Sequence, residues 1–323
     1  MQKGQMKTIE LQKAIIRIGN LLQMSFGQLG AIIIREQVSS GDGNLEIMIP
    51  GQKINAIFMI CKINQFVDYT EVLKTNLTDF LNKISSVVHE CAFRWDGWAN
   101  KSDGNKYLIT WKLPDLESHS NDAERNESLQ EQRTEMADES LITAIKIVSE
   151  IRRASQFNIY FRKNQMVQRF GSMNRPYITF GLHLGWTIQG AIGSDNKIDA
   201  CYLSPNLQIA SRVEELTKTY DMQILLSEPL YNYMSLKARN TLRKIDVILM
   251  NTFVNQALQN QQEPMGLYTF DMSFNNQEIS SIPEEHVVGD LIKLTKYETI
   301  NIENFKNKGV DYMFTLDSDI VGL

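Results

Sequence analysis

The sequence predicts an α+β domain in which helices cover one face of a sheet. From Ile178 to Ile188, apolar residues occupy every second position, which is typical of a half-buried strand. From Leu73 to Val88, they recur every three or four positions, which is typical of an amphipathic helix. The stretch Ile54–Cys61 is apolar at almost every position and predicts a fully buried strand.

The other elements of the N-terminal half have weaker signals. Apolar residues spaced by three or four predict an amphipathic helix over residues 8–38, interrupted or ended near Gly27 and Gly30. Residues 91–99 and 107–113 are expected to be two strands joined by a polar turn.

In the C-terminal half, a helix is expected over residues 141–154. The segment 190–199 (GAIGSDNKID) is expected to turn the chain into another short strand. Pro205 is expected to open a further helix, because proline suits the first helical turn. Short strands are expected at 223–226, 242–250 and 265–270.

Residues 114–139 differ in composition from their surroundings. They hold nine acidic residues, two arginines and almost nothing apolar, which favours a solvated, disordered insertion. The expected organisation is an N-terminal helix and loop (1–50), a sheet domain with this insertion (51–272) and a tail (273–323).

Composition excludes several classes of protein. The net charge of −5 does not suit a nucleic-acid binder, which normally presents a basic face. Cys61, Cys91 and Cys201 lie in apolar contexts and form no CxxC motif, so we expect reduced core residues of a cytoplasmic protein and no structural zinc. No apolar run approaches the roughly 18 residues that a membrane span needs, so none is expected.

Three motifs carry a family resemblance. They read ICKINQFVDYTE, NKSDGNKYLITWKL and FGLHLGWTIQGAIGSDNKIDACYLSPNLQIASRVEELTK. Their order and spacing resemble the class III adenylyl and guanylyl cyclase domain, most closely that of ciliate-type protists, over residues 54–271. The resemblance implies a ferredoxin-like βαββαβ sheet with helices on one face and extra C-terminal strands.

The resemblance also implies a site for two metal ions, held in that family by two aspartates over the nucleotide triphosphate. The matching positions here are Lys62 and Asn105. Lysine replaces a negative charge with a positive one and has no lone pair for a metal, and the asparagine amide carries no charge. We therefore expect no bound metal, no other cofactor and no catalytic residue.

In the family the rest of the site comes from a second subunit, because the domains act as head-to-tail dimers. The positions that match its nucleotide contacts are Lys101 and Cys201 for the base, Gln208 for the ribose and Arg212 for the transition state. Only Lys101 and Arg212 keep the family's residue plainly. Asparagine is usual at the position of Gln208, and a late V-K-G segment is replaced by VILMNT.

For several of these residues a functional and a structural interpretation remain open. Lys62 either holds a phosphate or a neighbouring carboxylate, or extends into water. Arg212 either reaches a shared site or pairs with Glu215 on a helix surface. His183 is expected to be a hydrogen-bonded structural residue.

Three hypotheses about function follow. The first is an inactive cyclase-like domain that acts as a structural or regulatory module and binds another cyclase-like domain or a large assembly. An axonemal location in a cilium rests on the ciliate-type resemblance alone. The second is the metal-free half of a heterodimeric cyclase. The third, an active homodimer, is excluded because both metal ligands are missing.

Overall fold

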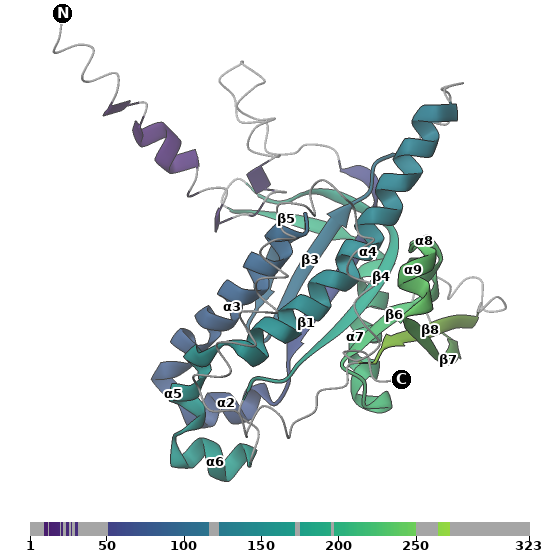
Figure 1. The fold of residues 1–323 in the computed structure, drawn as a ribbon. Helices are drawn as coiled ribbons and strands as arrows, with labels where there is room; N and C mark the ends of the chain where they lie inside the picture. Colours follow the sequence, from purple (N-terminus) through teal and green to yellow (C-terminus); the bar gives the residue numbers. More distant parts are fainter. Residues whose placement is uncertain are drawn as a thin grey trace, which may run out of the picture.

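The structure is a computed structural model that describes residues 51–115, 123–171, 175–194, 197–249 and 264–271, together with parts of 10–31. Its strands join in the order β2-β3-β1-β4-β6-β8-β7, and β5 pairs with β4 alone (Figure 1). The strands are β1 (Gln52–Ile63), β2 (Trp98–Asp103), β3 (Lys106–Lys112), β4 (Ile178–Ser194), β5 (Lys197–Leu203), β6 (Ile224–Ser227), β7 (Leu242–Leu249) and β8 (Pro264–Phe270). Neighbouring strands are antiparallel except β4 and β6, which are parallel.

Eight α-helices are described after β1: α2 (Phe66–Leu73), α3 (Leu77–Arg94), α4 (Ala123–Arg153), α5 (Asn158–Phe161), α6 (Asn164–Phe170), α7 (Pro205–Tyr220), α8 (Glu228–Tyr233) and α9 (Leu236–Asn240). The segment from β1 through α3, β2, β3 and α4 to β4 has the βαββαβ order, and its strands lie in the ferredoxin-like arrangement β2-β3-β1-β4. The α+β class and the predicted core topology are therefore confirmed.

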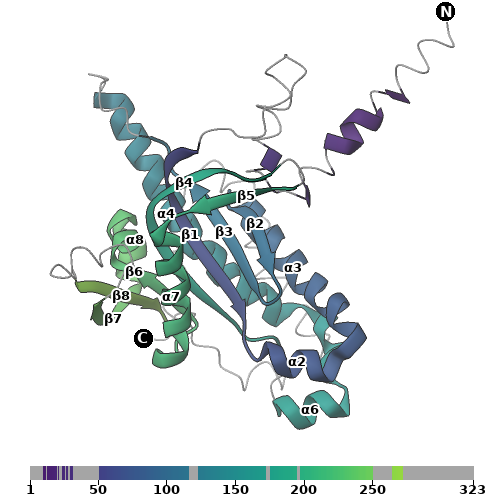
Figure 2. The ribbon, with the colours of Figure 1, turned by 180° about the vertical axis from the view of Figure 1, so that it is seen from behind.

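The helices lie on both faces of the sheet, where the sequence analysis expected one. Because successive side chains of a strand point to opposite faces, β1 supplies two cores. Ile57, Met59 and Cys61 pack with α3 and α4 in the larger one. Phe58 and Ile60 pack on the other face, in a smaller core that includes residues of α7 and β5. Figures 1 and 2 show these two layers from opposite sides.

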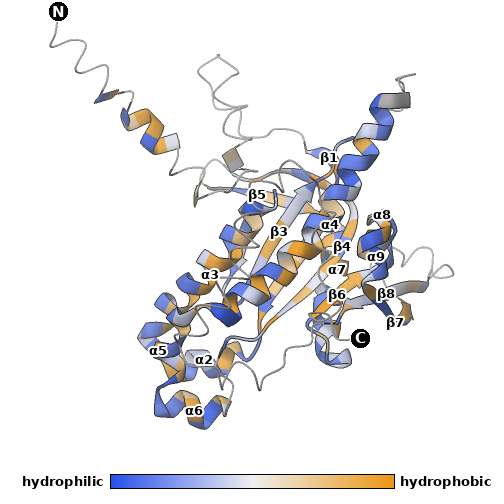
Figure 3. Ribbon diagram, viewed as in Figure 1, coloured by the Kyte–Doolittle hydropathy of each residue, from blue (hydrophilic) through white to orange (hydrophobic). Residues whose placement is uncertain are grey.

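The acidic segment is helical from Ala123 onward, so the prediction of a disordered insertion over 114–139 is wrong for 123–139. Residues 116–122 lie outside the described part. Most of the charged side chains lie on the solvated side of α4, which carries both hydrophilic and hydrophobic residues (Figure 3). Its buried side includes Ala137 and Asp138. Asp138 accepts a hydrogen bond from the Ser235 amide at 3.0 Å, so α4 also holds the start of α9.

Two other boundaries differ from expectation. Cys91 lies in α3, which continues to Arg94, and β2 begins only at Trp98. Gly97 lies between the two elements, where a larger residue would not fit because its Cβ would lie 2.7 Å from the Trp111 ring. Residues 190–194 extend β4 and residues 197–199 begin β5, because each of them pairs in the ladder between these two strands.

The remaining predicted strands and the helix opened by Pro205 are present. The described residues at the N-terminus are helical, and Leu11, Ile15 and Ile18 there are more than half exposed. The predicted tail, 273–323, lies outside the described residues.

Candidate functional site

The strand end that carries Lys62 meets the β2–β3 turn that carries Asn105. The Ile63 amide donates to the Asn105 carbonyl at 2.8 Å. Lys62 lies opposite Lys106 of β3 and opposite Thr179 of β4. The fold thus brings Lys62 and Asn105 together at one end of the sheet.

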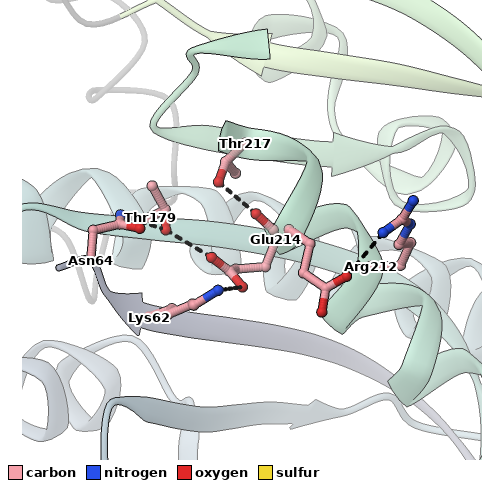
Figure 4. Close-up of polar contacts among 7 residues, drawn as sticks. Lys62, Asn64, Thr179, Arg212, Glu214 and Thr217 are labelled. Carbon is pink, nitrogen blue, oxygen red and sulfur yellow. Dashed lines mark hydrogen bonds and ion pairs between the residues drawn. The ribbon is translucent and has the colours of Figure 1, made fainter. Parts of the chain in front are cut away.

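Lys62 points toward the inner side of α7 and forms an ion pair with Glu214, with 3.3 Å between Nζ and Oε2 (Figure 4). The Glu214 side chain is 1% exposed and that of Lys62 is 27% exposed. Thr179 donates to Glu214 Oε1 at 2.8 Å, and Asn64 donates to Thr179 Oγ1 at 3.0 Å. Two interpretations of Lys62 were open, and the structure agrees with the one in which its ammonium binds a neighbouring carboxylate.

This carboxylate also influences the buried thiol beside Lys62. Burial raises the pKa of Cys61 well above its usual value, and the nearby Glu214 raises it further. Cys61 is therefore a neutral thiol at pH 7.

The residues at the two matched positions do not fit a pair of divalent metal ions. The ammonium of Lys62 stands where a carboxylate ligand would be needed, and Lys106 adds a second positive charge directly across the ladder. Among the described residues, the carboxylate in contact with Lys62 is that of Glu214, whose Oε2 faces the ammonium and whose Oε1 accepts a hydrogen bond from Thr179. In the described part of the chain, no cluster of three or more His, Cys, Asp or Glu residues is arranged to hold a metal.

The other matched positions lie elsewhere. Gln208 and Arg212 are exposed on the outer side of α7, and Arg212 pairs with Glu215 at 3.1 Å. Cys201 lies in β5, half-buried, opposite Gly190. Lys101 lies in β2, but its side chain is outside the described part. Within one chain, Gln208 and Arg212 do not lie at the same site as Lys62. They are on the outer side of α7, whereas its inner side faces the strand end that carries Lys62.

The motif GLHLGW positions α7 against the sheet. A Cβ on Gly181 would lie 2.3 Å from the Glu214 amide nitrogen, and one on Gly185 would lie 2.3 Å from Asn206 Cγ. Between them, His183 contacts the Ser227 hydroxyl at 2.7 Å and Asn206 Oδ1 at 3.1 Å. Burial lowers the pKa of His183 to about 4, so the ring is neutral at pH 7. The prediction that His183 is a hydrogen-bonded structural residue is confirmed.

Sequence reasoning missed Glu214, although the sequence held a signal for it. It lies seven residues after Leu207 and four after Ala210, on the apolar side of the helix. A carboxylate at such a buried position needs a cation or hydrogen-bond donors, and its cation here is Lys62, 152 residues earlier in the chain.

Comparison with solved structures identifies the architecture. A bacterial light-regulated adenylyl cyclase superposes with a TM-score of 0.57 at 18% identity, covering 81% of this chain and 63% of that one. The fold is that of a class III cyclase catalytic domain. An adenylyl cyclase from P. aeruginosa is also similar, with a TM-score of 0.48 at 17% identity, covering 71% of this chain and 99% of that one.

Similarity in sequence is more local. An adenylate cyclase from Anabaena cylindrica is 33% identical over 72 residues, which are 22% of this chain and 14% of that protein. The chain thus spans about a seventh of this curated relative and less than two thirds of the light-regulated enzyme. The family model for the all-helical domain of RasGEFs matches residues 1–39, which precede the cyclase fold. Among the described residues, we find no helix with the length and hydropathy of a membrane span.

Proposed function

We propose that this chain is a catalytically inactive cyclase-like domain that serves as a structural or regulatory interaction module. The observation that carries the proposal is the ion pair between Lys62 and Glu214 at the strand end. An aspartate there would present a charged oxygen to a metal, whereas Lys62 presents an ammonium that is already engaged.

The chemistry of cyclisation supports this proposal. Attack of a ribose 3′ oxygen on the α-phosphate builds negative charge on the attacking and leaving oxygens, and paired metal ions neutralise it. Lys62 and Lys106 supply two positive charges near the expected phosphate position. Ammonium groups, however, do not bridge the reacting oxygens or lower the pKa of a hydroxyl as a bound dication does.

An interaction role is supported by the β4–β5 hairpin. Trp186, Ile188 and Leu203 are 38–49% exposed, and Ile188 and Leu203 are directly paired across the two strands. Adjacent exposed apolar residues give a partner protein apolar surface to bury. The proposed partner is another cyclase-like domain or a larger assembly, in the cytoplasm or in a ciliary axoneme.

The alternative, a metal-free half of a heterodimeric cyclase, would use the outer side of α7. Arg212 is exposed there, which favours it, but Gln208 replaces the usual asparagine. The extra methylene displaces the amide that would orient the ribose, and positioning of that kind is sensitive to shifts of about an ångström.

The test is a cyclase assay with ATP and with GTP in the presence of Mn²⁺. We expect no cyclic nucleotide from the purified chain, and turnover above the background of a heat-treated sample would disprove inactivity. Mixing with a cyclase domain that has both metal aspartates separates the two functions. Activity that appears only in the mixture and is lost in Arg212→Ala would establish the heterodimer.

The double substitution Lys62→Asp with Asn105→Asp tests whether the two metal ligands are all that the chain lacks for metal binding. We expect this variant to bind Mn²⁺, measured by calorimetry, while the native chain does not. Mn²⁺ binding by the native chain would contradict the assignment of Lys62 as a residue that excludes metal.

A further inference from the structure

Glu214 is a buried carboxylate that the fold of α7 presses against the sheet. Its helix approaches β4 at Gly181 so closely that no side chain fits between them. Removing a carboxylate from water is costly unless its charge and its hydrogen-bonding capacity are both met. The position therefore requires a compensating cation.

The hydrogen bonding of this carboxylate is uneven. Oε1 accepts from Thr179, whereas Oε2 is buried without a hydrogen-bond partner and faces the Lys62 ammonium at 3.3 Å. In the part of the chain that the structure describes, the ion-pair partner of Glu214 is Lys62. Oε2 is thus an oxygen whose neutralisation depends on one nearby positive charge.

The cation reaches this oxygen from the strand, at the end of a flexible side chain. Lys62 leaves β1 at its second-last residue and remains about a quarter exposed, so its position is open to solvent on one side. A small molecule entering from that side would meet the same oxygen if the side chain were shortened. Asn64 fixes Thr179 and so keeps the rest of the position in place.

We propose that Oε2 of Glu214, in a carboxylate held in place by Thr179, forms a site for a single cation beside the end of β1, and that the tethered ammonium of Lys62 occupies it. The site takes a primary ammonium ion. One carboxylate oxygen supplies too few ligands and too little charge for a divalent metal. This site does not depend on whether the chain turns over nucleotide.

The test is chemical rescue of Lys62→Ala. This truncation removes Cγ, Cδ, Cε and Nζ, which n-propylammonium reproduces atom for atom. In NaCl we expect the melting temperature to fall by about 6–20 °C, the range for a buried charge that loses its partner in a domain of this size. Replacing NaCl with n-propylammonium chloride at equal ionic strength should restore part of the loss, with a saturable dependence on concentration.

The matched control is Lys106→Ala. Lys106 lies directly opposite Lys62 on β3 and has the same side chain. We expect little loss of melting temperature and no response to n-propylammonium. The same lack of response is expected in Lys62→Ala combined with Glu214→Gln, which removes the charge that holds the ammonium.

The proposal is overturned if Lys62→Ala melts at the native temperature, or if n-propylammonium raises the melting temperature of all three variants equally. Stabilisation of Lys62→Ala by Mn²⁺ but not by n-propylammonium would also overturn it, since the site would then be a divalent one. If Lys62→Ala is unfolded in NaCl, the readout is the yield on refolding from urea with the amine present. No gain in that yield counts against the site.

Discussion

The two sides of α7 obey different constraints. The inner side meets the sheet at van der Waals distance, and its polar residues Asn206 and Glu214 contact specific partners on β4 and β1. The outer side carries Gln208 and the exposed pair of Arg212 with Glu215, held together by the helix itself. The inner side is therefore required by the fold, whereas the outer side is free to change or to serve a partner.

This difference explains what the family resemblance could and could not supply. The positions that match nucleotide contacts, Gln208 and Arg212, lie on the outer side. The inner side holds the residues on which the seating of α7 depends. A long matched motif such as GLHLGW thus reflects the packing of a helix on a sheet and is poor evidence for catalysis.

The largest expected effect is that of Gly181→Ala on the inner side. The new methyl group would lie 2.3 Å from the Glu214 nitrogen and 2.6 Å from the Ala210 oxygen, which are backbone atoms that cannot rotate away. We expect a loss of more than about 3 kcal/mol in the free energy of unfolding, or failure to fold, measured by urea denaturation.

Two other glycines serve as controls for that experiment. At Gly185 the nearest atoms belong to the Asn206 side chain, which can rotate at the cost of its hydrogen bonds, so Gly185→Ala should cost about 1–3 kcal/mol. At Gly19 a new methyl group would have no neighbouring atom within 4 Å, and Gly19→Ala should be neutral or slightly stabilising. A smaller loss of stability for Gly181→Ala than for Gly185→Ala would contradict the expectation that contact with backbone atoms is more costly than contact with a side chain that can rotate.

Much of the fold could be predicted from the sequence, because its strands and long helices have regular apolar periods. The failures have physical causes. Residues 123–139 have a charged composition typical of disorder, yet Arg133 and Asp138 are buried because they bond to the Pro114 carbonyl and the Ser235 amide. Such partners are distant in sequence and leave no periodic signal.

The candidate site was predictable to a similar extent. The match to the family placed Lys62 and Asn105 at one end of the sheet, but it gave no partner for the lysine. The pairing with Glu214 depends on how α7 crosses β1, which the sequence period of either element does not specify. His183 was predicted to be hydrogen-bonded, whereas its bonds to Asn206 and Ser227 required the structure.

The next effect in size is a pH dependence from the inner side. The pKa of His183 falls from its ordinary value of 6.5 to about 4 in the folded chain, chiefly through burial. The unfolded chain takes up a proton near pH 6.5 while the folded chain does not, so stability should be lost as pH falls from 6.5 toward 4. The full shift corresponds to about 3 kcal/mol.

His183→Gln is the variant that isolates this contribution. It should lower stability at pH 7 but flatten the slope between pH 6.5 and 4, measured as the free energy of unfolding in urea at several pH values. Burial also lowers the pKa of His89, so the comparison is the difference in slope between the two proteins. Identical slopes would show that His183 is protonated as easily in the folded chain as in the unfolded one.

The smallest expected effect lies on the outer side, at Arg212→Ala. The pair with Glu215 is exposed and spans one helical turn, so its loss should cost less than about 0.5 kcal/mol. A double-mutant cycle with Glu215→Ala measures that coupling directly. Because the fold does not require Arg212, any large effect of this substitution on binding or on activity in a mixed cyclase assay comes from a partner. A loss of stability comparable to that of the inner-side variants would instead mean that the two sides of α7 are not independent.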